Sequence, residues 1–330
     1  MAEQDGFAYA ARNRARIALL IVLAVVNYWV ATVVAAVAIA LTLVFTVLVE
    51  GGDLPTDADI WKYLGIGVLI VIGIAVVIGS LVALFRLPFL RFGLEKRALE
   101  ETGAVVAPPD DHPQVRNLLE GLAIASGLPT PRFAIITDRA PNSFGVGTRP
   151  SKTIIAVTTG LIEALTRDEL EAILAYEVSR VGDWDVALSS WTFALTGSAI
   201  NTADSDGDDS FLRSLFGFLP RVFAQWLQTW AVTGQARHRD RTAIHFTRHP
   251  AALVRALENL DADTSEVVRV TRATAPLWVE VPTRTLGPSR YGRRLARELA
   301  LTERITTLRE LAFLRASSDD ATRQGPPLPP

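Results

Sequence analysis

The sequence contains no cysteine among its 330 residues. Without thiols the chain cannot form disulfides, hold a metal through thiolates or use a cysteine nucleophile. Histidine is also scarce, with only His112, His238, His245 and His249 present. Any metal site must therefore be built from these few imidazoles and from aspartate or glutamate carboxylates.

The chain also lacks a large net charge, because 33 basic side chains stand against 35 acidic ones. Proteins that bind nucleic acid usually carry a basic surface, so the composition predicts no nucleic-acid partner. Hydrophobic residues make up 49% of the sequence. A chain of this length and composition can bury a sizeable core in one or two domains.

Two long stretches near the N-terminus contain no charged residue, Ile17 to Val49 and Tyr63 to Phe85. About 20 apolar residues span a bilayer, whereas the core of a signal peptide has only about 7–15. The glycines of the second stretch are tolerated in membrane helices. We therefore predict a hairpin of two transmembrane helices over residues 17–94, after an N-terminal tail of residues 1–16.

The charges that flank these stretches predict their orientation. Basic residues precede the first stretch (residues 12–16) and follow the second (residues 86–97), whereas the connecting loop (residues 50–59) is acidic. Positively charged flanks stay on the cytoplasmic side. We expect a multi-pass protein of the plasma membrane whose N-terminal tail and soluble domain face the cytoplasm.

Residues 186–200 and 211–232 are two weaker apolar stretches. The first is only 15 residues long, and the second contains Arg213 and Arg221. An arginine near the bilayer centre costs about 2.5–3.5 kcal/mol on insertion scales. Residues 186–233 are a candidate membrane-associated hairpin, and the alternative is an amphipathic pair that lies on the membrane surface or on the domain.

The rest of the chain combines helical and strand patterns. A helix is predicted over residues 113–126, and strands are predicted over residues 132–136 and 153–158. Residues 140–147, APNSFGVG, are predicted to be a turn.

Further along, Thr166 and Glu169 have the spacing of a capping box, which starts a helix over residues 168–181. The chain after residue 235 is predicted to be helical, with breaks near Pro250 and across residues 275–289. Residues 319–330 are predicted to be disordered.

This order of motifs resembles the HtpX-type membrane zinc metalloproteases, which are gluzincin peptidases with an HExxH motif. Pro141, Asn142, Phe144 and Gly147 match the family's PNAFATG turn, and residues 158–175 follow the family pattern closely. The resemblance implies an α+β, mostly helical gluzincin-like domain with a small sheet over residues 95–318, preceded by two transmembrane helices. It also implies zinc endopeptidase activity in protein quality control.

The resemblance places the HExxH motif on Tyr176-Glu177-Val178-Ser179-Arg180. In that motif two histidines on one helical face bind zinc, and the glutamate is the general base. Here only Glu177 keeps the family residue. The third zinc ligand is expected at Ala236, and Asp240 resembles the carboxylate that supports a ligand in the family.

None of the three replacement residues is a good zinc ligand. A guanidinium has no lone pair to donate, alanine offers no donor atom, and tyrosine binds a metal only after its phenol loses a proton. We expect no cofactor, and zinc only if the enzyme is active with other ligands. His238, His245 and His249 form a weaker candidate site, because Pro250 disfavours helical geometry at the last histidine.

We further expect Arg180 to pair with Glu177, one helical turn earlier, and with Asp240. The alternative is that these residues are solvated charges on a helix surface.

Zinc proteases of this type bind substrate as an extra strand beside the strand that precedes the HExxH helix, and such pairing does not require the metal. The alternative is an edge strand that neighbouring loops protect. We predict residues 153–158 as that edge strand. The predicted substrate-binding residues are Asn142, Phe144, Gly145, Ile154, Ile155, Ala156 and Val157.

The resulting hypothesis is a membrane-anchored, inactive pseudoprotease that binds unfolded or membrane-protein segments or modulates an active relative. One alternative is an active membrane zinc metalloendopeptidase in protein quality control that uses ligands not identified in the sequence. The other is a structural membrane scaffold.

Overall fold

The structure is a computed structural model that describes residues 2–49, 58–204, 223–230, 250–263, 265, 267–279, 305–306 and 308–310. The chain divides into two compact units, one of residues 18–92 and one of residues 1–17 together with 93–330. The N-terminal residues therefore belong to the same unit as the soluble domain. Asn13 illustrates this, because its side-chain amide donates a buried 2.8 Å hydrogen bond to the carbonyl of Asp183.

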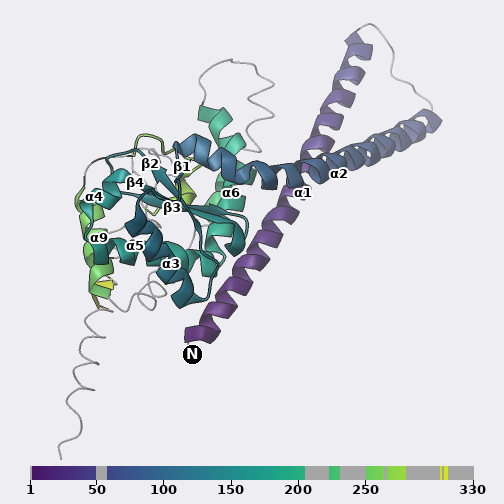
Figure 1. Ribbon diagram of the computed structural model, residues 1–330. Coiled ribbons are helices and arrows are strands. Elements are labelled where there is room, and N and C mark those ends of the chain that lie inside the picture. Colours follow the sequence, from purple (N-terminus) through teal and green to yellow (C-terminus); the bar gives the residue numbers. More distant parts are fainter. Residues whose placement is uncertain are drawn as a thin grey trace, which may run out of the picture. The chain divides into compact units, whose positions relative to one another are not determined.

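Helices α1 (Ala2–Val49) and α2 (Ala58–Thr102) contain the two predicted apolar stretches (Figure 1). Each has a segment long and apolar enough to cross a membrane, Ala8–Thr42 and Gly65–Thr102. Many large apolar side chains of residues 19–92 are exposed, as lipid-facing side chains would be. These two candidate membrane helices confirm the predicted fold class at this end of the chain.

Within the unit of residues 18–92 the two helices meet through small and polar side chains. The indole nitrogen Nε1 of Trp29 donates to Oγ of Ser80 at 2.8 Å. A Cβ atom at Gly79 would lie only 2.8 Å from Oγ1 of Thr32, so a larger residue would push the helices apart. The glycine is therefore part of a helix–helix contact.

The second unit contains a four-stranded sheet with the strand order β1-β2-β4-β3. The strands are β1 (Val105–Val106), β2 (Arg132–Ile136), β3 (Ser143–Gly147) and β4 (Thr153–Thr158). β4 is parallel to β2 and antiparallel to β3. The two predicted strands are confirmed, whereas the predicted turn over residues 140–147 is wrong from Ser143 onward, because residues 143–147 pair with β4.

The predicted edge strand is also wrong. β4 lies between β2 and β3, and all six of its residues are buried. Its unbroken apolar run is typical of a strand covered on both faces. The edge strand is β3, for which the glycines of the sequence had indicated a turn. Gly147 is required there, since a Cβ atom would lie 2.2 Å from the carbonyl oxygen of Lys152.

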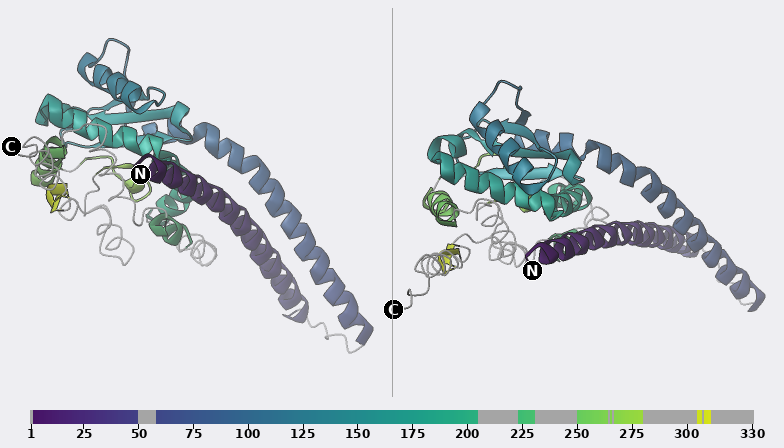
Figure 2. Two further views of the ribbon diagram at one scale, coloured as in Figure 1. Left: turned by 90° about the horizontal axis from the view of Figure 1, so that it is seen from below. Right: turned by 60° about the horizontal axis from the view of Figure 1, so that its bottom comes forward.

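Helices surround this sheet (Figure 2). They are α3 (Pro113–Ser126), α4 (Thr159–Ala164), α5 (Arg167–Gly182), α6 (Asp185–Asp204) and α9 (Pro250–Ala262), with 3-10 turns at Pro150–Lys152 (η1) and Ala275–Leu277 (η2). The predicted helix at 113–126 is confirmed. α5 is central, since α3, α6 and α9 all pack against it.

The start of α5 carries the predicted capping box. The backbone N–H of Thr166 donates to the carboxylate of Glu169 at 3.0 Å, and Arg255 of α9 pairs with the same carboxylate at 3.3 Å. Burial raises the pKa of Glu169, but the bonds from Thr166 and Arg255 outweigh it, so the net pKa lies below its ordinary value. This ionised cap fixes where the helix begins.

The middle of α5 is buried on every side, from Ala172 to Val181. A helix without a solvent-facing side is a core helix. Any charged residue in this stretch must therefore find its partners inside the protein. Helix α6 is also a core helix over its first half, since most side chains from Val186 to Thr196 are buried. Most of the second stretch of the proposed hairpin, residues 211–222 and 231–232, lies outside the described residues, so the hairpin stays a prediction.

Candidate active site

Glu177 and Arg180 lie one turn apart in the buried middle of α5, and both side chains are 0% exposed. Nη1 of Arg180 donates to Oε2 of Glu177 at 2.9 Å. The predicted pairing is confirmed, and the alternative of two solvated charges is wrong. Asp240, the other expected partner, lies outside the described residues.

Among the described residues, three further groups contact this pair. Nε of Arg180 donates to Oδ2 of Asp185 at 2.9 Å, and Nη1 also donates to the main-chain carbonyl of Leu277 at 3.0 Å. The hydroxyl of Ser143 donates to Oε1 of Glu177 at 2.9 Å. Both oxygens of Glu177 are thus hydrogen-bonded, one to a hydroxyl and one to a guanidinium.

Sequence reasoning missed Ser143, Asp185 and Leu277. Asp185 had a local signal, because it opens the helix that follows α5 only five residues after Arg180. The chain reverses between the two helices at Trp184, whose φ of 60° is in the left-handed region. Leu277 had no local signal, since 97 residues separate it from Arg180.

The open side of β3 is covered by the segment that contains Leu277. Trp278 forms an antiparallel bridge with Phe144, and the N–H of Val279 donates to the carbonyl of Ser143 at 3.0 Å. The rings of Phe144 and Trp278 pack with their centroids 4.8 Å apart. The main chain of Trp278 and Val279 therefore pairs with β3 directly after the 3-10 turn η2, as the start of an added strand would.

The other end of the same edge is also occupied. The N–H of Gly147 donates to Oγ of Ser190 on α6 at 3.0 Å. Gly145, one of the predicted binding residues, lies against α5 and α6, because a Cβ there would lie 2.8 Å from Cγ2 of Val186 and 3.2 Å from Oε2 of Glu177. A glycine at this place lets the strand approach the carboxylate closely.

Asn142 and Phe144 are buried, at 2% and 0% exposed. The side-chain oxygen of Asn142 accepts from the N–H of Ser143, and its own N–H donates to Oγ1 of Thr158. Asn142 therefore fixes the entry into β3. Of the remaining predicted binding residues, Ile154, Ile155, Ala156 and Val157 lie in the interior strand, where the neighbouring strands use the backbone on both sides.

The donor atoms at the motif position do not fit a zinc ion. Arg180 offers only N–H donors and brings a positive charge within 2.9 Å of Glu177. Tyr176 is buried at 2% exposure. Among the described residues no three His, Asp or Glu side chains gather into a metal-binding group. Ala236 and the three histidines of the weaker candidate site lie outside those residues.

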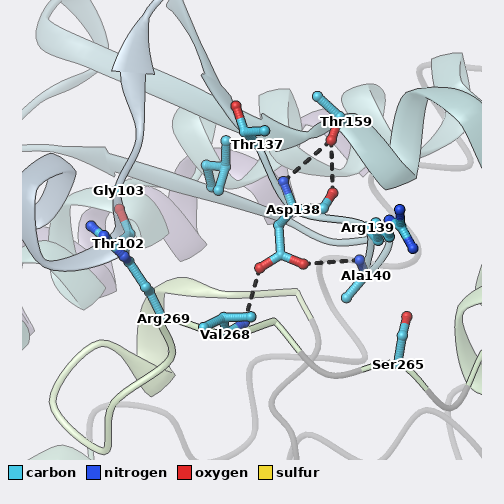
Figure 3. Close-up of a pocket in the computed structure, with 11 residues that line it drawn as sticks. Thr102, Gly103, Thr137, Asp138, Arg139, Ala140, Thr159, Ser265, Val268 and Arg269 are labelled. Atoms are coloured by element: carbon cyan, nitrogen blue, oxygen red, sulfur yellow. Dashed lines mark hydrogen bonds between the residues drawn. The ribbon is translucent and has the colours of Figure 1, made fainter.

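A separate pocket of about 660 Å³ contains none of the predicted site residues (Figure 3). The carboxylate of Asp138 points into it and accepts hydrogen bonds from the N–H groups of Ala140 and Val268. These bonds tie the loop after β2 to the segment that follows α9. The pocket is lined by Thr102, Gly103, Ile136, Thr137, Asp138, Arg139, Ala140, Thr159, Ser265, Val268 and Arg269.

Comparison with known proteins identifies the family. The profile of peptidase family M48 matches residues 109–292, more than half of the chain, and the chain belongs to this family. Its similarity is to the HtpX-type membrane metalloproteases of the family. A protease HtpX homolog of Dictyoglomus turgidum is 28% identical over 252 residues, which cover 72% of this chain and 82% of the relative.

Two other HtpX homologs match a similar share of the chain. The one from Dictyoglomus thermophilum is 30% identical over 62% of this chain and 74% of its own length. The one from Tropheryma whipplei strain Twist is 32% identical over 64% and 76%, respectively. The predicted family is therefore confirmed.

Proposed function

We propose that this protein is a membrane-anchored pseudoprotease of the HtpX type, which has kept the peptidase fold without the peptidase reaction. The observation that carries the proposal is the buried ion pair of Arg180 with Glu177. A catalytic zinc ion polarises the scissile carbonyl and acidifies its bound water, and it needs three protein ligands to do so. The guanidinium stands on the motif position of one of these ligands.

Glu177, at the position of the family's general base, is also not accessible to a substrate or to water. A general base must reach the proton that it removes, directly or through one water molecule. Glu177 is 0% exposed, and its two oxygens accept from Ser143 and Arg180. In this arrangement the carboxylate holds β3 and α5 together instead of activating water.

The two candidate membrane helices support a membrane anchor, with the soluble domain on the cytoplasmic side because of the basic flanks. In this location the domain binds extended segments of unfolded or membrane proteins, or modulates an active relative by competing for the same segments. Pairing with a strand edge gives affinity through backbone hydrogen bonds, which require no metal.

Metal content and activity measured on one preparation of the full chain test the proposal. We expect far less than one zinc per chain and no cleavage of a labelled unfolded protein such as casein. Stoichiometric zinc, together with chelator-sensitive cleavage that is lost in Glu177→Gln, would refute it.

A gain-of-function variant tests the same proposal from the other side. The triple substitution Tyr176→His, Arg180→His and Ala236→Glu rebuilds the family ligand set and should create a zinc site. Asp185 is already placed to accept a hydrogen bond from a histidine at position 180. The double variant that keeps Ala236 is the matched control, and it should bind zinc more weakly because it lacks one ligand.

A further inference from the structure

A segment of the same chain, residues 275–279, lies on the edge of β3. Trp278 forms the antiparallel bridge with Phe144, and the N–H of Val279 donates to the carbonyl of Ser143. An extended peptide that adds to an exposed sheet edge makes this type of contact. The segment therefore takes the place of a bound peptide.

Leu277 also contacts helix α5 as the main chain of a bound peptide would. Its main-chain carbonyl accepts from Nη1 of Arg180 at 3.0 Å, and the same nitrogen donates to Glu177. A fixed positive charge on a main-chain carbonyl is what a catalytic metal ion provides to a scissile bond. The guanidinium thus holds the carbonyl in a site where no reaction follows.

The side chains show which kind of segment fits. Trp278 is 1% exposed, with its ring against Phe144, and Leu277 and Val279 are also buried. The occupant is apolar, with a 3-10 turn (Ala275–Leu277) followed by the extended Trp278, whose large aromatic side chain lies opposite Phe144. A free segment of this composition has the chemistry to replace it.

One feature of the docked segment opposes its binding. Nε1 of Trp278 is buried and has no hydrogen-bond partner among the described residues. A buried donor that lacks an acceptor loses its hydration without compensation, which weakens the docked state. The segment therefore binds at a specific site, but the unsatisfied indole N–H reduces the stability of the docked state.

From these observations we propose that residues 275–279 are an intramolecular pseudosubstrate that competes for the β3 edge with extended apolar, aromatic-containing segments of other proteins. The proposal rests on the proposed function, because it gates the same site. When the site is open in only a fraction of the molecules, the apparent dissociation constant of a peptide rises in inverse proportion to that fraction. Weakening the docked segment should then tighten peptide binding by the same factor.

The substitution Val279→Pro removes the N–H that bonds to Ser143. Trp278 precedes it with φ −75° and ψ 153°, which is a conformation that a residue before proline adopts readily. Val279→Ala is the control, because it also alters the buried side chain, by removing both γ-methyl groups, but keeps the N–H. The probe is a fluorescein-labelled synthetic peptide with the sequence of residues 273–279, ATAPLWV, and a scrambled peptide serves as the reference.

Fluorescence anisotropy with the full chain in detergent should show about tenfold tighter binding of the peptide to Val279→Pro than to Val279→Ala. Equal affinities would refute the pseudosubstrate and leave the proposed function intact. Cleavage of the peptide would refute the proposed function whatever the affinities. Absence of binding by every variant would refute the pseudosubstrate and favour the structural scaffold.

Hydrogen exchange on the unmodified protein gives a test that does not depend on the folding of a variant. Saturating peptide should displace the segment and increase amide exchange across residues 275–279, while exchange in α3 stays constant. Unchanged exchange in the segment, in the presence of bound peptide, would show that the two do not compete.

Discussion

The substitution Arg180→Met is expected to destabilise the soluble unit strongly. Arg180 is 0% exposed and donates to Glu177, Asp185 and the carbonyl of Leu277. Methionine fills much of the space of the side-chain stem but makes none of these bonds. Two buried carboxylates then lose their ion pair with this guanidinium.

The expected size follows from this burial. Removal of one partner from a buried ion pair costs about 3–5 kcal/mol, because the remaining charge loses its partner without regaining water. For a unit of this size, 1 kcal/mol corresponds to a shift of roughly 2–4 °C in melting temperature. We therefore expect Arg180→Met to melt roughly 6–20 °C below the unmodified protein.

Thermal unfolding followed by tryptophan fluorescence on the full chain in detergent provides the assay. Arg309→Met is the matched control, because Arg309 forms an ion pair with Glu258 near the surface, where the two side chains are 64% and 35% exposed. Such a pair contributes only about 0–1 kcal/mol. Its loss should lower the melting temperature by no more than a few degrees.

A rescue variant separates charge from packing. Adding Glu177→Gln and Asp185→Asn to Arg180→Met removes the two carboxylate charges that the guanidinium balanced, and should recover a large part of the loss. A melting temperature of Arg180→Met within about 2 °C of the unmodified protein would refute the reasoning. A triple variant no more stable than the single one would show that shape, and not charge, explains the loss.

The remaining predictions concern the cap, the sheet and the N-terminus. The pKa of Glu169 is lowered in the folded protein, so the stabilisation by its carboxylate is present above about pH 4.5 and is lost as the pH falls through the folded-state pKa. The substitution Glu169→Gln should therefore lower the free energy of unfolding by about 1 kcal/mol in a urea titration at pH 7, and by less at pH 3. Gly147→Ala should lower the free energy of unfolding by about 3 kcal/mol or more, because its Cβ atom would lie 2.2 Å from the backbone of Lys152. Gly121→Ala, with open space around it in α3, should instead raise the stability by about 0.5–1 kcal/mol. Equal effects of the two substitutions on the melting temperature would contradict the close approach at β3. Asn13→Ala should cost about 1 kcal/mol by removing the bond to Asp183, and no effect on urea unfolding would show that the N-terminal residues are not part of the soluble unit.

Patterns that act over a few neighbouring residues could be predicted from the sequence. The capping box at Thr166 depends on two residues three apart, and the strand of residues 153–158 on one apolar run. The same holds for the pair of Glu177 and Arg180, which one helical turn brings together. Local geometry determines these features, so they are visible without the fold.

Strand order could not be predicted in this way. An apolar run such as residues 153–158 is consistent with an interior strand and with a covered edge strand, and only the pairing with β2 and β3 decides between them. The glycines of β3 indicate a turn when they are considered alone. In the folded protein they let the strand approach Glu177 and Lys152 closely.

The sequence by itself predicted two apolar helices, a peptidase domain of the HtpX type and an arginine at the position that the resemblance assigns to a zinc-binding histidine. The tertiary structure decided what that arginine does. It brings Asp185 from the next helix and the carbonyl of Leu277 from a segment 97 residues away to one guanidinium. Contacts over such a separation depend on how the whole unit packs, because no local pattern specifies which main-chain carbonyl a buried guanidinium will meet.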